Sequence, residues 1–295
     1  KISEAVPNHS TTDSDLFVLK DIRASRVNLV MNDYAAGLPS PLSFLGLGDL
    51  IARQLGLHPW SARVIPILHR VYVSEGRTKP EMENKSGIFE PIETIEDMTG
   101  SVEISLLLHL PGCESESALR AQLVGRRIAG GLIQNDYVEV RSVTPDGSAF
   151  CGLRRGYAMI RPEQPERRFI TSGDLTPEQP GLEHIAETLF PADRPLSFGW
   201  IVPAAVGYRL LEDPKTVPQR IRTRSKDIAH VYAEPVLGIA ELVSVRNVRL
   251  TSLTMSDLSA LFWSWDARDD LVLGHPAYHP RTDVTAQCKE IPTNG

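Results

Sequence analysis

The spacing of apolar residues along the chain predicts alternating strands and helices. Residues 15–30 predict a strand in which basic residues interrupt the apolar ones, and the leucines and isoleucine of 41–55 recur at helical spacing. Polar and apolar positions alternate over 100–110 before an apolar end, which is typical of a strand, and 63–73 predicts another. Over 114–133 the spacing is again helical, with acids near the start and arginines near the end, as the helix dipole favours.

The second half of the chain predicts mostly strands, which cover 134–143, 156–160, 198–209 and 230–243. A last helix is predicted over 256–265, where Ser256 provides the N-cap. The proline-rich segment 162–194 is expected to wrap the surface with a short helix at 182–189, and the tail from Asp266 is expected to be irregular.

The polar, acidic and turn-rich stretch 74–99 joins two of the predicted strands. A connection of this length is either a disordered loop or a protruding hairpin. Because residues 87–95 have the composition of a strand, we expect the hairpin.

The order strand, helix, strand, hairpin, strand, helix, strand is close to the β-α-β-β-α-β pattern of a ferredoxin-like or RNA-recognition fold. We therefore expect an α+β protein with a thumb-like hairpin insertion and a β-rich C-terminal extension. The expected divisions are a flexible arm (1–14), a ferredoxin-like domain (15–161) with the insertion 74–99, a surface wrap and β-rich part (162–265), and an irregular tail (266–295).

Composition narrows the class of protein. The 295 residues are 42% hydrophobic and 23% charged, which is ordinary for a soluble globular protein, and no apolar run approaches the roughly 20 residues of a membrane span. The first 14 residues are polar and do not resemble a secretory signal. Three scattered cysteines support neither a disulfide framework nor a zinc site, which fits a reducing cytoplasmic location.

The uneven distribution of charge is more informative than the formal net charge of -6, which itself argues against indiscriminate coating of nucleic acid. Acidic residues outnumber basic ones over 75–103. Basic residues gather in three other stretches: Arg126 and Arg127; Arg154, Arg155, Arg161, Arg167 and Arg168; and Arg220, Arg222, Arg224 and Lys226. One face is thus suited to phosphates and another to a basic partner, while the alternative that each run is a solvated surface stays open.

Candidate chemistry is sparse, and we expect neither catalysis nor a metal or other cofactor. His275 and His279 are four residues apart, but each precedes a proline, so a helix that presents both to zinc is not expected. No nucleophile motif or phosphate-binding glycine loop occurs. Gly130 and Gly131 permit close approach of a backbone beside Arg126 and Arg127; RNA phosphate and a plain helix C-cap are both consistent with them.

Two further features favour binding to a polyanion. The basic cluster 219–226 lies between two strand-like apolar runs, a layout that suits holding a phosphate backbone. Among the aromatic residues, Tyr34 and Tyr157 are the better candidates for stacking on bases, whereas core packing is expected for Trp200 and Tyr232.

Several local sequences together resemble a known family. They are the Gly-x-Pro turn and apolar helix from Gly37 to Gly46, GSVEISLLLHLPG from Gly100, RRIAGGLI from Arg126, GWIVPAAVGYR from Gly199, and HVYAEPVLGIAELVS from His230. Their order over about residues 15–265 resembles the Csy-two (Cas-five-type) subunit of type I-F CRISPR surveillance complexes. The arginine-rich stretch 221–228 and the acidic insertion depart from the family pattern, which suggests a divergent or variant-system member.

The resemblance implies a non-catalytic subunit that holds the 5′ handle of the CRISPR RNA, pairs with the large PAM-reading subunit, abuts the first repeated backbone subunit and meets target DNA only indirectly. By position, Arg126, Arg127, Gly130 and Gly131 would border the handle. Arg220, Arg222, Arg224 and Lys226 would contact phosphates, and Arg77 and Lys79 would lie on the thumb. From charge and stacking chemistry we add Lys20, Arg23, Arg26, Tyr34, Arg154, Arg155 and Tyr157.

Two alternatives remain open from the residues alone. The first is an RNA-processing endonuclease of the same superfamily with His69 or His109 as the general base. The second is a protein-only scaffold whose basic loops bind an acidic partner.

Overall fold

The computed structural model describes residues 15–31, 35–74, 78–95, 98–162, 199–220, 229–268 and 270–276. Several expectations lie outside these residues: the arm 1–14, the surface wrap over 163–198 with its helix 182–189, the tail from 277, and the site candidates Tyr34, Arg77, Arg222, Arg224 and Lys226.

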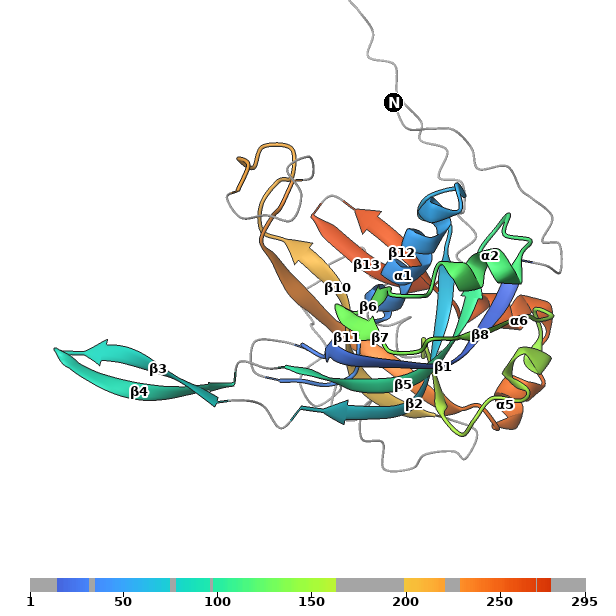
Figure 1. Cartoon of the computed structure of the whole chain (residues 1–295), viewed down its shortest axis with the longest axis horizontal. Coiled ribbons are helices and arrows are strands. Elements are labelled where there is room, and N and C mark those ends of the chain that lie inside the picture. The colour runs from blue at the N-terminus through green and yellow to red at the C-terminus, as the bar shows by residue number, and fades with distance from the viewer. Residues whose placement is uncertain are drawn as a thin grey trace, which may run out of the picture.

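The protein is α+β and is built on one large antiparallel sheet (Figure 1). Its strand order is β12-β13-β10-β11-β9-β2-β5-β1-β7-β6, and β8 also pairs with β1. The strands are β1 (Leu16–Asn28), β2 (Arg63–Val73), β5 (Thr99–His109), β6 (Arg127–Ile128), β7 (Gly131–Ile133), β8 (Glu139–Ser142), β9 (Tyr157–Ile160), β10 (Trp200–Leu210), β11 (Ala233–Ser244), β12 (Trp263–Arg268) and β13 (Leu271–Pro276). Strands from both halves of the chain therefore share a single sheet.

The centre of the sheet is the run β2-β5-β1-β8. β5 lies between β1 and β2 and is antiparallel to both, and β8 is antiparallel to β1 on its other side. The chain passes through α1 (Pro41–Gln54) between β1 and β2, and through α2 (Glu116–Ala121) between β5 and β8.

α1 begins where its sequence contains both a cap and a suitable first residue. Ser40 is extended, and its hydroxyl accepts from the Leu42 N–H at 3.3 Å, while Pro41 occupies the first turn, where a missing N–H does no harm. Phe44, Leu45 and Ile51 on one stripe of the helix are fully buried. The helix therefore covers one side of the central strands.

Each central strand separates two apolar layers because side chains alternate across a sheet. Phe17, Leu19 and Ile22 of β1 pack in the larger layer, under α1. Leu16 and Val18 face a second layer with η1 (Gly147–Phe150), α5 (Val248–Thr251) and α6 (Met255–Ala260). This second layer covers only one end of the central strands, so the other end of the same side is left to polar residues.

The hairpin predicted within 74–99 is present. β3 (Thr78–Lys85) and β4 (Ile88–Ile95) pair in a two-stranded sheet of their own, and Figure 1 shows them extending away from the main sheet. Ser86 and Gly87 form the turn with φ of 55° and 88°, a pair of positive φ angles that suits a two-residue hairpin.

The helix predicted over 114–133 is wrong beyond its first turns. α2 ends at Ala121, and the chain then forms the short strands β6 and β7, which turn at Ala129 and Gly130 with φ of 48° and 79°. β7 pairs with β1. Pairing with β1 therefore outweighs the helical spacing, and the helix C-cap interpretation of Gly130 and Gly131 is wrong as well.

Three smaller expectations also need correction. The last helix starts from a Thr254 cap, not Ser256, and ends at Ala260. Residues 263–268 and 271–276, expected as helix end and irregular tail, form the paired strands β12 and β13. Within 134–143, only Glu139–Ser142 is a strand.

Candidate functional site

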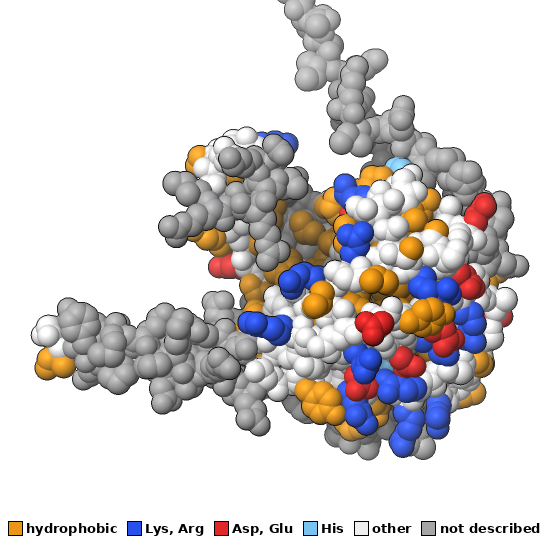
Figure 2. Space-filling model, viewed as in Figure 1, with side chains coloured by type: hydrophobic (Ala, Val, Ile, Leu, Met, Phe, Trp, Pro, Cys, Tyr) orange, Lys and Arg blue, Asp and Glu red, His pale blue; other side chains and the backbone are white. Residues whose placement is uncertain are grey.

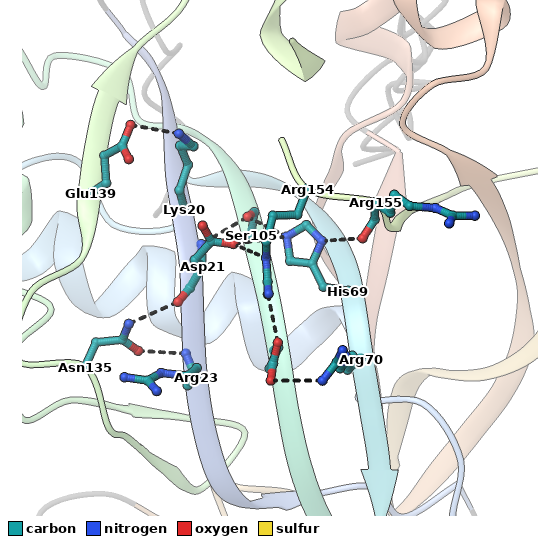
Figure 3. A network of polar contacts seen from close by, with 11 residues as sticks. Lys20, Asp21, Arg23, His69, Arg70, Ser105, Asn135, Glu139, Arg154 and Arg155 are labelled. Atoms are coloured by element: carbon teal, nitrogen blue, oxygen red, sulfur yellow. Dashed lines mark hydrogen bonds and ion pairs between the residues drawn. The ribbon is translucent and has the colours of Figure 1, made fainter. Parts of the chain in front are cut away.

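The side of β1, β5 and β2 that faces away from α1 carries a set of polar residues at the end that the second apolar layer leaves free. Register places Arg23, Glu103 and Arg70 in one row across the three strands. The next row contains Ser25, Ser101 and Tyr72. We call this surface the polar sheet face: Asp21, Arg23, Ser25, His69, Arg70, Tyr72, Ser101, Glu103 and Ser105, with Arg154 and Arg155 from the loop before β9 (Figure 3).

Arg154 joins two carboxylates on this face. Its Nε lies 2.6 Å from Asp21 Oδ1, and its Nη2 lies 2.8 Å from Glu103 Oε2. The hydrogen bond from Arg154 lowers the pKa of the Glu103 carboxyl, and the same bond raises the pKa of Arg154. Arg70 lies farther from Glu103, with 4.0 Å between Nη1 and Oε1. The positive charge of Arg154 is therefore paired with carboxylates of the polar sheet face itself and is not available to a ligand.

His69 is held by hydrogen bonds on both ring nitrogens. Nδ1 lies 3.0 Å from the Arg155 carbonyl oxygen, which can only accept, so Nδ1 carries the proton. Neutral Nε2 then accepts from the Ser105 hydroxyl at 2.7 Å, and that oxygen accepts from the Asp21 N–H at 3.1 Å. Burial lowers the pKa of His69, which agrees with a neutral ring.

The loop that carries Arg154 and Arg155 approaches β2 closely because residue 156 is glycine. A Cβ at Gly156 would lie 2.6 Å from His69 Nδ1 and 2.7 Å from the Leu68 carbonyl oxygen. Any larger residue would push the loop away and lengthen the bond from His69 to Arg155.

Asp21 reaches Arg154 because β1 is irregular at this point. The pairing of β1 with β5 shifts between Leu19 and Ile22, and Asp21 has a φ of 55°. Asn135 holds the irregularity by donating its side-chain amide to the Asp21 carbonyl at 3.0 Å and accepting from the Arg23 N–H at 2.7 Å. Such bulges re-aim side chains and often lie next to functional sites.

Other cations of this region are available to a ligand. In the described part of the chain, the side chains of Arg23, Arg26 and Arg155 make no hydrogen bond or ion pair. Tyr72 is 56% exposed on the same face, so its ring is also accessible. Tyr157 is 44% exposed, but it pairs with Leu68 and therefore lies on the α1 side of the sheet, away from this face. Figure 2 shows the Lys and Arg side chains gathered, with a few acids among them, over the region of β1, β5 and β2.

The β6–β7 hairpin extends the Ser25 row beyond β1. Ser25 pairs with Leu132, and Leu132 pairs with Arg127, whose Nη1 donates to the Gly130 carbonyl at 2.7 Å. Gly131 does permit a close backbone approach, but to β1: a Cβ there would lie 2.5 Å from the Ser25 carbonyl oxygen. The Arg126 Nε donates to the Gln122 carbonyl at 3.0 Å.

The remaining predicted site residues have partners within the chain or lie elsewhere. Lys20 Nζ lies 2.9 Å from Glu139 Oε1. Arg220 pairs with both carboxylate oxygens of Glu212 and has its guanidinium 4.1 Å from the Tyr232 ring centroid. Lys79 lies on β3, outside the main sheet.

Sequence reasoning assigned two aromatic residues wrongly. Trp200 is 59% exposed and Tyr232 is 64% exposed, although core packing was expected for both. Trp200 opens β10, and the ring of Tyr232 lies against Arg220.

Sequence reasoning did not place Asp21, Arg70, Tyr72, Glu103 or Ser105 in a site. The alternation of Ser101, Glu103 and Ser105 with apolar residues did signal a polar side for that strand. This alternation does not reveal the strand register that brings β5 beside His69 and Arg154.

The described residues provide neither a cluster of metal ligands nor a membrane-spanning helix. Among them, no three His, Cys, Asp or Glu side chains come together as metal ligands would. None of the described helices has the length and apolar character needed to cross a membrane.

Comparison with protein families finds a match over part of the chain. A family model described as CRISPR-associated protein (Cas_Csy2) matches residues 182–273, which is roughly a third of the chain. The resemblance of this chain to the Csy2 family is thereby confirmed. The matched range includes β10, β11, α5, α6 and β12, whereas the polar sheet face lies before it. No curated protein matched the chain.

Proposed function

We propose that this chain is a non-catalytic RNA-binding subunit of a type I-F CRISPR interference complex, in which it caps the 5′ handle of the guide RNA. The observation that carries the proposal is that Arg23, Arg155 and the exposed Tyr72 lie on one face of the sheet, in a chain that matches a CRISPR-associated family.

The strand order supports an RNA-recognition-like core. β8-β1-β5-β2, with one helix between β1 and β2 and another between β5 and β8, is the order in which a β-α-β-β-α-β unit assembles its sheet. In RNA-recognition domains the sheet side that the helices leave uncovered binds single-stranded RNA. The polar sheet face is the corresponding side of this protein.

The side chains of the polar sheet face suit the phosphate backbone of single-stranded RNA, with bases stacked on an aromatic ring at the edge of the face. Arginines with no internal partner offer charged donors to phosphate oxygens. The ring of Tyr72 offers a stacking surface, worth about 1–3 kcal/mol per base. Glu103 and Asp21, held by Arg154, would repel phosphates from the middle of the face. We therefore expect the RNA backbone to follow the arginines beside these acids.

The proposed partners follow from the family. They are the CRISPR RNA, the large PAM-reading subunit and the first repeated backbone subunit, with target DNA met only indirectly and no membrane. The β3–β4 hairpin would act as the thumb toward the backbone subunit, and Arg77 and Lys79 would lie on it. Arg222, Arg224 and Lys226 remain proposed phosphate contacts, as does Tyr34 for stacking. The proposed location is the cytoplasm.

The surroundings of the two histidines support a non-catalytic role over the endonuclease alternative. The His69 side chain is 2% exposed, and both of its nitrogens already have partners. Burial lowers the pKa of His109 to about 4, far from the range in which a general base works best at neutral pH.

The proposal is tested by co-expressing the chain with its genomic neighbours, purifying through a tag on this chain and sequencing the small RNA that accompanies it. We expect uniform RNAs that share a repeat-derived 5′ end, together with stoichiometric protein partners. Incubation of the purified chain with repeat RNA should give no cleavage. Protein that purifies with its partners but without RNA would favour the scaffold, and cleavage that a His69→Ala change stops would favour the endonuclease.

A further inference from the structure

At the opposite end of the same sheet side, three strands and α6 enclose a cavity of about 450 Å³. Register places Arg63 of β2, His109 of β5 and Leu16 of β1 in one row across its floor. Met255 and Leu258 of α6 and the following Phe262 form the apolar part of the wall, and hydroxyl side chains of α6 and its cap complete it with Pro145. The second apolar layer separates this cavity from the polar sheet face, so the two are distinct places on the protein.

The cavity contains two nitrogen-bearing groups that have no hydrogen-bond partner among the described residues. His109 Nδ1 is buried and has no hydrogen-bond partner there. The Arg63 guanidinium likewise makes no hydrogen bond or ion pair with a described residue. Burial lowers the pKa of Arg63, which shows that the guanidinium is partly desolvated. A desolvated arginine without a counterion is unfavourable, and such groups in proteins normally have a partner.

Asp257, the acidic residue of α6, does not act as a counterion for Arg63. Asp257 closes the cap of its own helix, where its Oδ2 accepts from the Thr254 hydroxyl at 2.6 Å and from the Thr254 N–H at 3.3 Å. The titratable side chains among the lining residues are therefore Arg63 and His109.

We infer that this cavity receives a partner protein's segment in which a carboxylate stands next to an aliphatic side chain. The carboxylate would pair with Arg63 and accept from His109, and the aliphatic side chain would lie against Leu16, Met255 and Phe262. The composition of the wall distinguishes this occupant from RNA: it has one arginine, and most of its exposed lining is apolar. A nucleic-acid backbone calls for several cations, whereas a protein anchor combines apolar burial with one charged pair.

Two features of the lining agree with this occupant. Met255 is 48% exposed at the rim, which suits a flexible apolar contact for a partner. His109 is neutral at pH 7 and can present a proton on either nitrogen, so a bound carboxylate makes its protonated form more favourable.

The test uses the full chain and two peptides that differ only in charge, acetyl-leucyl-glutamyl amide and acetyl-leucyl-glutaminyl amide. Binding is followed by NMR through the ring protons of His109, which are assigned by comparison with a His109→Gln sample. We expect the glutamyl peptide to bind at least tenfold more tightly than the glutaminyl peptide, and the pKa of His109 to rise when it is bound.

Arg63→Gln should abolish the preference for the glutamyl peptide, whereas Arg127→Gln, an equal loss of charge at the far end of the sheet, should leave it unchanged. The measurements on the unaltered protein keep the test valid if Arg63→Gln does not fold. Equal binding of the two peptides would overturn the inference. So would saturable binding of inorganic phosphate at His109 without binding of either peptide, because the pocket would then be a phosphate site.

Discussion

Replacing Arg154 with glutamine tests whether the polar sheet face is held together by its internal charges. The variant removes two charge-assisted hydrogen bonds, of 2.6 Å to Asp21 and 2.8 Å to Glu103. Hydrogen bonds to charged groups contribute about 1.5–3 kcal/mol when well buried, but exposed ion pairs contribute only about 0.2–1 kcal/mol. The Arg154 and Asp21 side chains are each 47% exposed and Glu103 is 25% exposed. We therefore expect a loss of about 1–2 kcal/mol in the free energy of unfolding.

The pH dependence of this loss follows from the lowered pKa of Glu103. A carboxyl whose pKa is lower in the folded state stabilises the protein fully above its unfolded pKa, about 4.3, and loses that contribution as the pH falls through the folded value. The difference between wild type and Arg154→Gln should thus be largest near pH 7 and should shrink below about pH 4.

The assay is urea denaturation of both proteins at pH 7 and at pH 3.5, with Glu103→Gln and the double variant completing a mutant cycle. We expect a coupling of about 0.5–1.5 kcal/mol at pH 7 between the two positions. Arg155→Gln is the matched control, because this neighbouring side chain makes no hydrogen bond or ion pair with a described residue. A coupling near zero at pH 7, or an equal loss at both pH values, would refute the reasoning.

Three further predictions concern close approaches and internal pairing. Gly156→Ala should lower the free energy of unfolding by about 1–3 kcal/mol in urea denaturation, because its Cβ would meet His69 Nδ1 at 2.6 Å; a neutral result would contradict this. Gly131→Ala should destabilise by a similar amount, since its Cβ would lie 2.5 Å from the Ser25 carbonyl oxygen, and thermal unfolding checks it. Arg220→Gln should lower the midpoint of urea denaturation slightly through loss of the Glu212 pair while leaving the salt dependence of RNA binding unchanged; an altered salt slope would count against the internal role.

The strongly periodic segments were predictable from sequence. Strands over 15–30, 63–73 and 100–110 and the helix from Pro41 all correspond to elements of the structure, because each has a periodic apolar side that packs in the larger apolar layer.

The failures share one physical cause, which is pairing between distant residues. Leu119, Leu123 and Ile128 are all buried, as a helix over 114–133 would require, yet the chain leaves the helix after Ala121 to pair with β1. The same competition converts the end of the last predicted helix into β12, where Trp263 is buried against the core and its indole N–H donates to the Met159 carbonyl at 2.9 Å. Local spacing cannot reveal these partners.

The candidate site was predictable in its cations but not in its arrangement. Arg23, Arg154 and Arg155 were selected from charge, and the structure brings them to one face. The pairing of Arg154 with the acids depends on a bulge at Asp21 and on the close approach of the loop at Gly156. The charge pattern of the sequence signals neither of these features.

The central claim is tested most directly by the salt dependence of RNA binding in an Arg23→Gln, Arg155→Gln double variant. Its control is Arg53→Gln with Lys215→Gln, an equal loss of charge on α1 and in the turn after β10. For single strands each lost phosphate contact lowers the slope of log affinity against log salt by about 0.7, so the double variant should lose about 1.4 with repeat RNA while the control keeps the wild-type slope. An unchanged affinity and slope in the double variant would contradict the assignment of the polar sheet face as the RNA-binding surface.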